Sequence, residues 1–216
     1  ACVPGNHDCV YGDYNFLPQQ PLGVLYAAGV FKRLYDGYEY YLGPADSVSA
    51  NVAVYPYNRE TDTWANGSPF DVTRIMDEFP IVRVVGIPFH GNKYDMERFT
   101  SLEKGDEDVL ICAAHVLASL DGGSMFEGED IIRYSDLLDT APDVYCFGHW
   151  HMDQGIEELG GKKFINVGSL TRGSLSQDEV QRRPACVGIT VAEGGALTTD
   201  IHRLNVKPAE EGFDLE

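Results

Sequence analysis

The sequence predicts a layered α/β fold, and three features of the chain lead to this prediction. Three runs rich in apolar residues, at 81–89, 108–115 and 143–151, have the composition of strands buried on both faces. Helical patterns stand between these runs, an alternation that is typical of strands joined by helices. The end of the chain, from residue 162, indicates consecutive strands instead. We therefore expect two packed mixed β-sheets flanked by helices, in a single domain of residues 1–216.

The elements before the first buried strand follow less regular patterns. Residues 38–43 and 51–58 have strand composition, and residues 70–79 favour a short helix. Residues 14–37 predict an amphipathic helix, because Pro21 is tolerated in the first turn. Its apolar residues are Leu22, Leu25, Ala28, Val30, Phe31 and Leu34.

The remaining elements are two helices that complete the alternation of strands and helices, followed by consecutive strands. Residues 94–105 predict a helix that Gly105 ends, and residues 134–141 predict a short helix. An antiparallel extension is expected after them, in which the last two strands form a hairpin through the turn AEGGA. The strands of this extension are residues 162–170, 185–191 and 197–204.

The composition excludes several classes of protein. The chain is 44% hydrophobic, which is too apolar for a disordered protein, and no apolar run approaches the roughly 18 residues that cross a bilayer. Five cysteines without CxxC spacing favour reduced thiols and a cytoplasmic location. The net charge of −18 argues against a broad nucleic-acid-binding face, but not against phosphate chemistry in a metal-lined cleft.

Four of the six histidines lie at or beside predicted strand ends. His115 ends one buried strand, His149 and His151 end the next, and His7 follows a short apolar segment. Imidazoles at the carboxyl ends of neighbouring strands converge on one crevice. On an extended chain, His149 and His151 point to the same side roughly 6.5 Å apart, a separation that suits metal binding. The other two histidines are His90 and His202. We expect each of them to be an ordinary hydrogen-bonded, half-buried side chain.

Three ordered motifs resemble a known family. They are GNHD at residues 5–8, His115, and GHWH at residues 148–151. Together they are similar to the last three blocks of the calcineurin-like metallophosphoesterases, whose pattern runs D-x-H, G-D, G-N-H-[DE], H, G-H-x-H. Residues 164–172, FINVGSLTR, also resemble the strand and loop that follow the family's last block. The first two blocks are not found in this sequence, so the resemblance implies an αββα sandwich that is N-terminally truncated and lacks its first strands.

The resemblance implies a site for two divalent metal ions. Asn6, His115 and His149 would hold one ion, and His151 would hold the other. The remaining ligands would belong to the absent blocks. Imidazole, carboxylate and amide ligands suit manganese first, with iron or zinc as alternatives.

The resemblance also implies a mechanism, in which a hydroxide that bridges the two ions attacks phosphorus. His7 would stabilise charge on the phosphoryl oxygens or protonate the leaving oxygen, and Asp8 would orient His7. A turn-capping role is the alternative for Asp8. Arg172 is the candidate substrate-binding residue, with surface ion pairing as its alternative. Because the absent blocks carry ligands, we expect the 216-residue chain alone to be inactive.

Further details resemble one branch of the family, the DNA-repair exonucleases of the SbcD kind and their bacteriophage relatives. Residues 20–34, 73–95 and 167–172 carry this similarity. Asp8 in place of Glu is unlike the serine/threonine protein phosphatases of the family, whose motif is usually GNHE. The similarity implies an exonuclease or endonuclease acting on DNA, with an ATPase partner subunit and a homodimer as expected partners and no membrane. The acidic charge favours an alternative, a phosphodiesterase acting on small nucleotides or other phosphoesters. A second alternative is a non-catalytic binding module with a degenerate site.

Overall fold

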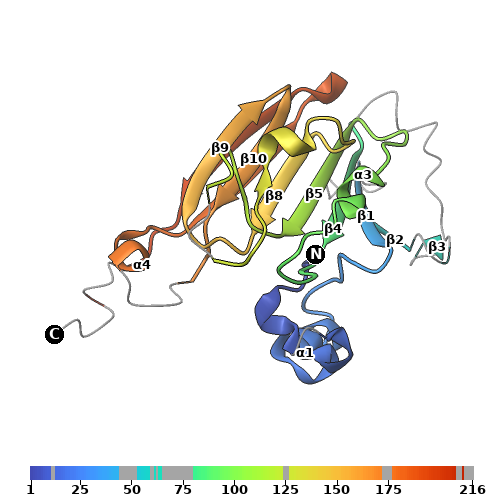
Figure 1. Cartoon of the computed structure of the whole chain (residues 1–216). Helices are drawn as coiled ribbons and strands as arrows, with labels where there is room; N and C mark the ends of the chain where they lie inside the picture. Colours follow the sequence, from blue (N-terminus) through green and yellow to red (C-terminus); the bar gives the residue numbers. More distant parts are fainter. Residues whose placement is uncertain are drawn as a thin grey trace.

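The structure is a computed structural model, and it describes residues 1–10, 13–43, 53–58, 61, 63–64, 80–123, 127–171, 177–207 and 211. Within these residues, the centre of the molecule is an eight-stranded mixed sheet (Figure 1). Its strands, in spatial order, are β3 (Thr63–Trp64), β2 (Ala53–Asn58), β1 (Tyr38–Gly43), β4 (Val82–Ile87), β5 (Val109–His115), β8 (Val144–Gly148), β10 (Lys162–Val167) and β9 (Asp153–Leu159).

The three apolar runs of the sequence become adjacent strands in the middle of this sheet. β4, β5, β8 and β10 run parallel, whereas β1 and β2 on one side and β9 on the other are antiparallel to their neighbours. Strands buried on both faces need apolar side chains at nearly every position, which these runs supply. The carboxyl ends of the parallel strands therefore meet at one edge of the sheet.

Each face of the sheet buries its own apolar cluster. On one face, the short helices α3 (Glu97–Thr100) and η4 (Tyr134–Leu137) bury Phe99, Tyr134 and Leu137 against the sheet. On the other face, an antiparallel ribbon of β11 (Ala185–Val191) and β12 (Leu197–Arg203) packs its apolar side chains on the central strands. The predicted layered α/β class is confirmed, and so is the hairpin through residues 192–196, which contains η5 (Glu193–Gly195).

The remaining short elements are η1 (Asn6–Asp8), η3 (Tyr14–Gln19), α1 (Pro21–Ala27), β6 (Ala118–Ser119), β7 (Ile132–Arg133) and α4 (Gln177–Gln181). Among them, α1 lies beyond the ends of the central strands (Figure 1), whereas Ala118 and Ile132 belong to the buried cluster beneath α3 and η4. None of the helices in the described ranges is long and apolar enough to cross a membrane.

The single helix predicted over residues 14–37 is wrong in its extent. The chain forms η3 and α1 instead, with Pro21 in the first turn of α1 as predicted. Gly29 has a φ of 72°, a left-handed conformation that ends a helix. Beyond it, the backbone at Lys32 and Leu34 hydrogen-bonds to Cys2, so these residues are extended.

The helices predicted over residues 94–105 and 134–141 are also shorter than expected. α3 ends at Thr100 rather than at Gly105, and η4 is a single 3₁₀ segment. The chain after α3 is used for other contacts, because the Glu103 carbonyl accepts a hydrogen bond from the buried Arg83. The helix predicted over residues 70–79 lies outside the described residues.

Candidate metal centre

The side-chain oxygen of Asn6 lies between two histidines at the carboxyl end of the parallel strands. Asn6 Oδ1 is 3.1 Å from His115 Nε2 and 3.3 Å from His149 Nδ1. The two imidazole rings are 5.0 Å apart between centroids. The structure thus brings together one residue from η1, the last residue of β5 and the residue that follows β8.

The strand register and two glycines make this approach possible. His115 pairs with Gly148 across β5 and β8. A Cβ atom on Gly5 would lie 2.6 Å from His115 Cε1, and one on Gly148 would lie 3.0 Å from His115 Nδ1. Because glycine has no Cβ, the imidazole of His115 fits between these two backbone segments.

The environment of His115 keeps its imidazole neutral. Burial, followed by the positive charge of His149, His151 and His7, lowers the pKa of His115 to about 3. Phe89 covers the cluster, with its ring centroid 6.2 Å from that of His115 and 5.4 Å from that of His149. A neutral imidazole has a free lone pair, which is the form that binds a metal ion.

The backbone at His149 corrects one expectation from the sequence. β8 ends at Gly148, and His149 has a φ of 83°, so the chain is not extended through GHWH. The prediction that His149 and His151 point to the same side of a strand is therefore wrong. His149 is largely buried, whereas His151 is exposed. Positive φ values are uncommon outside glycine and often occur at functional sites.

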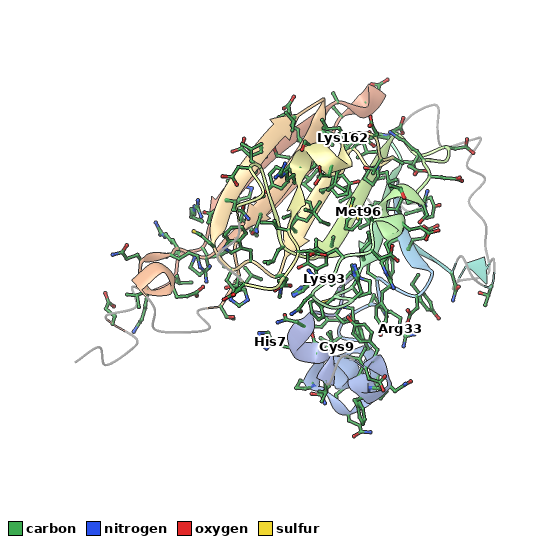
Figure 2. All side chains as sticks on the ribbon, viewed as in Figure 1. His7, Cys9, Arg33, Lys93, Met96 and Lys162 are labelled. Carbon is green, nitrogen blue, oxygen red and sulfur yellow. The ribbon has the colours of Figure 1, made fainter. Side chains whose placement is uncertain are left out.

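The other predicted site residues lie around this cluster or outside the described chain. His7 is exposed, beyond the carboxyl ends of the central strands (Figure 2). Asp8 Oδ2 accepts a hydrogen bond of 3.0 Å from the Gly5 backbone N–H, so its carboxylate caps the GNHD turn. Among the described residues, the side chains of His7 and His151 make no hydrogen bond, whereas the His151 backbone carbonyl accepts one of 3.2 Å from the Ser169 N–H. Arg172 lies outside the described residues.

The histidines that we did not assign to the site have ordinary environments. The Nδ1 atom of His90 lies 3.0 Å from the Pro88 carbonyl, and its Nε2 atom accepts a hydrogen bond from the Asp95 backbone. This agrees with the prediction of a hydrogen-bonded, half-buried side chain. His202 is exposed on β12, so the half-buried environment predicted for it is wrong.

The sequence did not point to Glu129, which contacts the site directly. Its Oε1 atom is 2.8 Å from His149 Nε2 and 2.7 Å from the Tyr94 hydroxyl. Glu129 belongs to none of the three motifs and is 20 residues from His149. No pattern in the sequence could have identified it.

The donor atoms of the cluster fit one divalent ion. Two donors bound to the same ion at about 2.1 Å are separated by about 3.0–3.4 Å, depending on the coordination geometry. The separations of Asn6 Oδ1 from the two imidazole nitrogens, 3.1 and 3.3 Å, fall in this range. Within the described part of the chain, no three His, Cys, Asp or Glu side chains are grouped to hold a metal. The candidate donor set therefore depends on the amide oxygen of Asn6.

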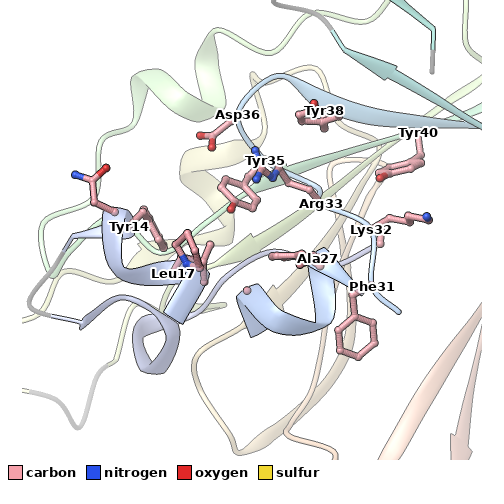
Figure 3. Close-up of a pocket in the computed structure, with 15 residues that line it drawn as sticks. Tyr14, Leu17, Ala27, Phe31, Lys32, Arg33, Tyr35, Asp36, Tyr38 and Tyr40 are labelled. Carbon is pink, nitrogen blue, oxygen red and sulfur yellow. The ribbon is translucent and has the colours of Figure 1, made fainter. Parts of the chain in front are cut away.

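A separate pocket of about 1070 Å³ lies among η3, α1 and β1 (Figure 3). Tyrosines and two cations, Lys32 and Arg33, are among its lining residues, and no histidine lines it. The Arg33 guanidinium lies over the rings of Tyr35 and Tyr38, at 5.2 and 5.6 Å from their centroids. The hydroxyl of Tyr14, another lining residue, donates to the carbonyl of Phe89, the residue that covers the histidine cluster.

Comparison with known proteins bears on residues 1–153. A family model described as calcineurin-like phosphoesterase matches this range, which contains Asn6, His115, His149 and His151. No curated protein matches the chain.

Proposed function

Because the chain belongs to the calcineurin-like phosphoesterases, we propose that its histidine cluster hydrolyses phosphodiesters, with DNA as the first candidate substrate. Metal-dependent phosphoester hydrolysis is the activity of the family. The observation that carries the proposal is the convergence of Asn6, His115 and His149, one donor residue from each of the three family motifs.

Each residue of the cluster has a proposed role. Asn6, His115 and His149 would hold one divalent ion, and His151 would contribute to a second. When bound, such ions lower the pKa of water and neutralise charge on the phosphoryl oxygens. Manganese is the proposed ion, with iron or zinc as alternatives, because the donors are imidazole nitrogens and an amide oxygen.

His7 and Asp8 act on the substrate side of this arrangement. The exposed imidazole of His7 would contact the phosphoryl oxygens or donate a proton to the leaving oxygen. The Asp8 carboxylate holds the GNHD turn through the Gly5 N–H, and this contact would orient His7. Arg172 is kept as a proposed substrate contact.

The resemblance to SbcD-type exonucleases supports DNA as the substrate, and the charge supports a second candidate. The net charge of −18 repels a polyanion, which favours a small nucleotide or another small phosphodiester. Two cations of the described residues are already paired with carboxylates: Arg182 with Glu179 at 2.8 Å, and Lys93 with Asp130 at 2.6 Å. An ATPase partner subunit or a second copy of the chain would then add contacts to DNA. Both partners remain predictions from the sequence, as does the cytoplasmic location.

We further propose that the 216 residues alone bind one ion firmly and hydrolyse slowly or not at all. The reason is that Asn6, His115 and His149 complete the donor set of one ion only. Calorimetry with Mn²⁺ should give one strong site on this chain. Hydrolysis of bis-p-nitrophenyl phosphate and of linear DNA by the Mn²⁺-loaded chain should be slow or undetectable.

His149→Ala tests the site itself. This substitution should lower the affinity for Mn²⁺ at least tenfold, whereas the control His202→Ala, an exposed histidine of β12, should leave it unchanged. If the chain binds no ion and hydrolyses no phosphodiester, the non-catalytic binding module is the correct interpretation.

A further inference from the structure

We propose that Glu129 is a positioning residue for His149. It would fix the imidazole as the tautomer protonated on Nε2 and so direct the Nδ1 lone pair toward Asn6. The use of Nδ1 as a metal ligand rests on the proposed function, but the choice of tautomer does not.

Two oxygen atoms compete for the ring proton of His149. Glu129 Oε1 is 2.8 Å from Nε2, and Asn6 Oδ1 is 3.3 Å from Nδ1. A neutral imidazole carries one N–H, so only one of these contacts is a hydrogen bond. The carboxylate is closer and charged, and hydrogen bonds to charged acceptors are the stronger ones. The proton therefore belongs on Nε2.

Glu129 is itself held in place by Tyr94. The Leu117 backbone N–H donates to the Tyr94 hydroxyl oxygen at 2.9 Å, and the Tyr94 hydroxyl is 2.7 Å from Glu129 Oε1. Since the tyrosine oxygen accepts from Leu117, its own hydrogen points to Glu129. Burial and the neighbouring carboxylate raise the pKa of Tyr94, so it stays a donor.

The backbone around this pair is tied together as well. The Tyr94 backbone N–H donates to Asp130 Oδ2 at 3.2 Å, and the Asp130 backbone N–H donates to the Asn92 carbonyl at 2.9 Å. The side chains of Glu129 and His149 are only 11% and 12% exposed. Their contact is therefore shielded from solvent and built on a fixed segment.

With the proton on Nε2, the lone pairs of His149 Nδ1 and Asn6 Oδ1 face each other. Two lone pairs at this separation do not attract each other, but a cation between them would bind both. Histidines that bind metals generally donate their other ring N–H to a carboxylate or carbonyl, and loss of that partner lowers metal affinity about 10–100-fold. Glu129 supplies this contact for His149.

The tautomer can be measured without any metal. We would record long-range ¹H–¹⁵N correlations of the histidine rings of the whole chain, in EDTA at pH 8, with His149 assigned by comparison with His149→Ala. The unaltered chain should give the Nε2–H tautomer for His149. Glu129→Ala should convert it to Nδ1–H, because Asn6 Oδ1 is then the remaining acceptor. Glu129→Gln should keep Nε2–H, because the amide oxygen still accepts.

Metal affinity is the second measurement, made by calorimetry with Zn²⁺ and Mn²⁺. Glu129→Ala should bind about 10–100-fold more weakly than the unaltered chain. The control Glu127→Gln, an exposed residue of the same loop, should show neither change. Circular dichroism establishes that each variant is folded.

Three outcomes decide the proposal. An Nδ1–H tautomer in the unaltered chain overturns it, and this result does not depend on any variant. An Nε2–H tautomer that persists in folded Glu129→Ala also overturns it. An Nε2–H tautomer that depends on residue 129 supports the positioning role even if the chain binds no ion, a result that would refute only the proposed metal site.

Discussion

The imidazole of His115 fits beside Asn6 and His149 because two neighbouring residues have no side chain. Gly5 and Gly148 both approach the ring so closely that a Cβ atom would enter its contact distance. The candidate metal centre therefore depends on residues that would provide no ligand. Their role is steric, and a single methyl group tests it.

We expect Gly5→Ala to displace His115 and weaken metal binding. The new Cβ would lie 2.6 Å from His115 Cε1, so the ring or the turn must move. Overpacking of this kind costs about 1–3 kcal/mol of folding stability. Calorimetry with Mn²⁺ and urea denaturation would measure both effects.

Gly123→Ala is the matched control for this substitution. Its Cβ would meet only the Asp121 carboxylate, at 3.3 Å, on an exposed turn. If Gly5→Ala binds Mn²⁺ as tightly as Gly123→Ala does, the steric role of Gly5 is refuted.

The burial of the cysteines leads to a prediction about the order in which their thiols react. Cys186 is exposed, whereas Cys112 is fully buried in β5, and all five cysteines are free thiols. Burial raises the pKa of Cys112, and it raises the pKa of Cys146 to about 11. Because the thiolate is the reactive form, iodoacetamide at pH 8 should modify Cys186 first and leave Cys112 and Cys146 unmodified until the chain is unfolded. Mass spectrometry of peptides would show this order, and equal labelling of Cys186 and Cys112 would contradict it.

Sequence motifs could identify Asn6, His115 and His149 because their order along the chain is characteristic. They could not identify Glu129, because its contact with His149 joins residues 20 positions apart that share no motif. They also gave a wrong geometry for GHWH, because His149 has a φ of 83°, a conformation that is uncommon outside glycine.

At the scale of elements, the strands were more predictable than the helices. A strand buried on both faces requires a continuous apolar run, and β4, β5 and β8 coincide with such runs. The helices are short, and tertiary contacts set their ends. The segment after α3, for example, turns toward Arg83 instead of continuing the helix.

Arg83 gives β4 a charged residue inside the sheet, and this leads to a prediction about stability. Its guanidinium pairs with Glu39 of β1 at 2.9 Å and with Glu107 at 3.0 Å, and its side chain is only 4% exposed. Arg83→Ala would leave two buried carboxylates without their partner. Removing one member of a buried ionic group typically costs about 3–5 kcal/mol. Urea denaturation should show a loss of this size.

Arg98→Ala is the control for the buried group. Arg98 lies on α3 and is half exposed, 3.9 Å from Asp95, and exposed pairs of this kind contribute about 1 kcal/mol or less. A loss for Arg83→Ala no larger than that for Arg98→Ala would mean that the buried group does not hold β1 against β4.

At the scale of the whole molecule, the layered arrangement was predictable but the strand order was not. Alternating strands and helices followed by a hairpin indicate the layers. The position of β10 between β8 and β9, and of β1 beside β4, follows from long-range pairing that no local pattern records. This order places β5 next to β8, which brings His115 beside His149.

The charge of the whole molecule leads to an experiment that distinguishes the two substrate candidates, DNA and a small phosphodiester. With a net charge of −18, the chain attracts DNA only where cations are concentrated, and Lys32 and Arg33 are exposed at the pocket beside α1. If DNA is the substrate, the double substitution Lys32→Ser and Arg33→Ser should lower its hydrolysis several-fold, since each lost phosphate contact weakens binding. Hydrolysis of bis-p-nitrophenyl phosphate should be unchanged, because the substituted residues lie outside the histidine cluster.

Comparing the two hydrolysis rates requires a form of the protein that hydrolyses bis-p-nitrophenyl phosphate. Arg98→Ser is the control for the loss of an exposed cation. Hydrolysis of DNA should also fall steeply as salt rises from 50 to 200 mM, because cations that bind phosphates release counterions. Two results together would favour the small phosphodiester: equal rates on DNA for the double variant and the control, and a weak dependence on salt. In that case the acidic surface excludes polyanions, and the histidine cluster acts on substrates with a single phosphodiester.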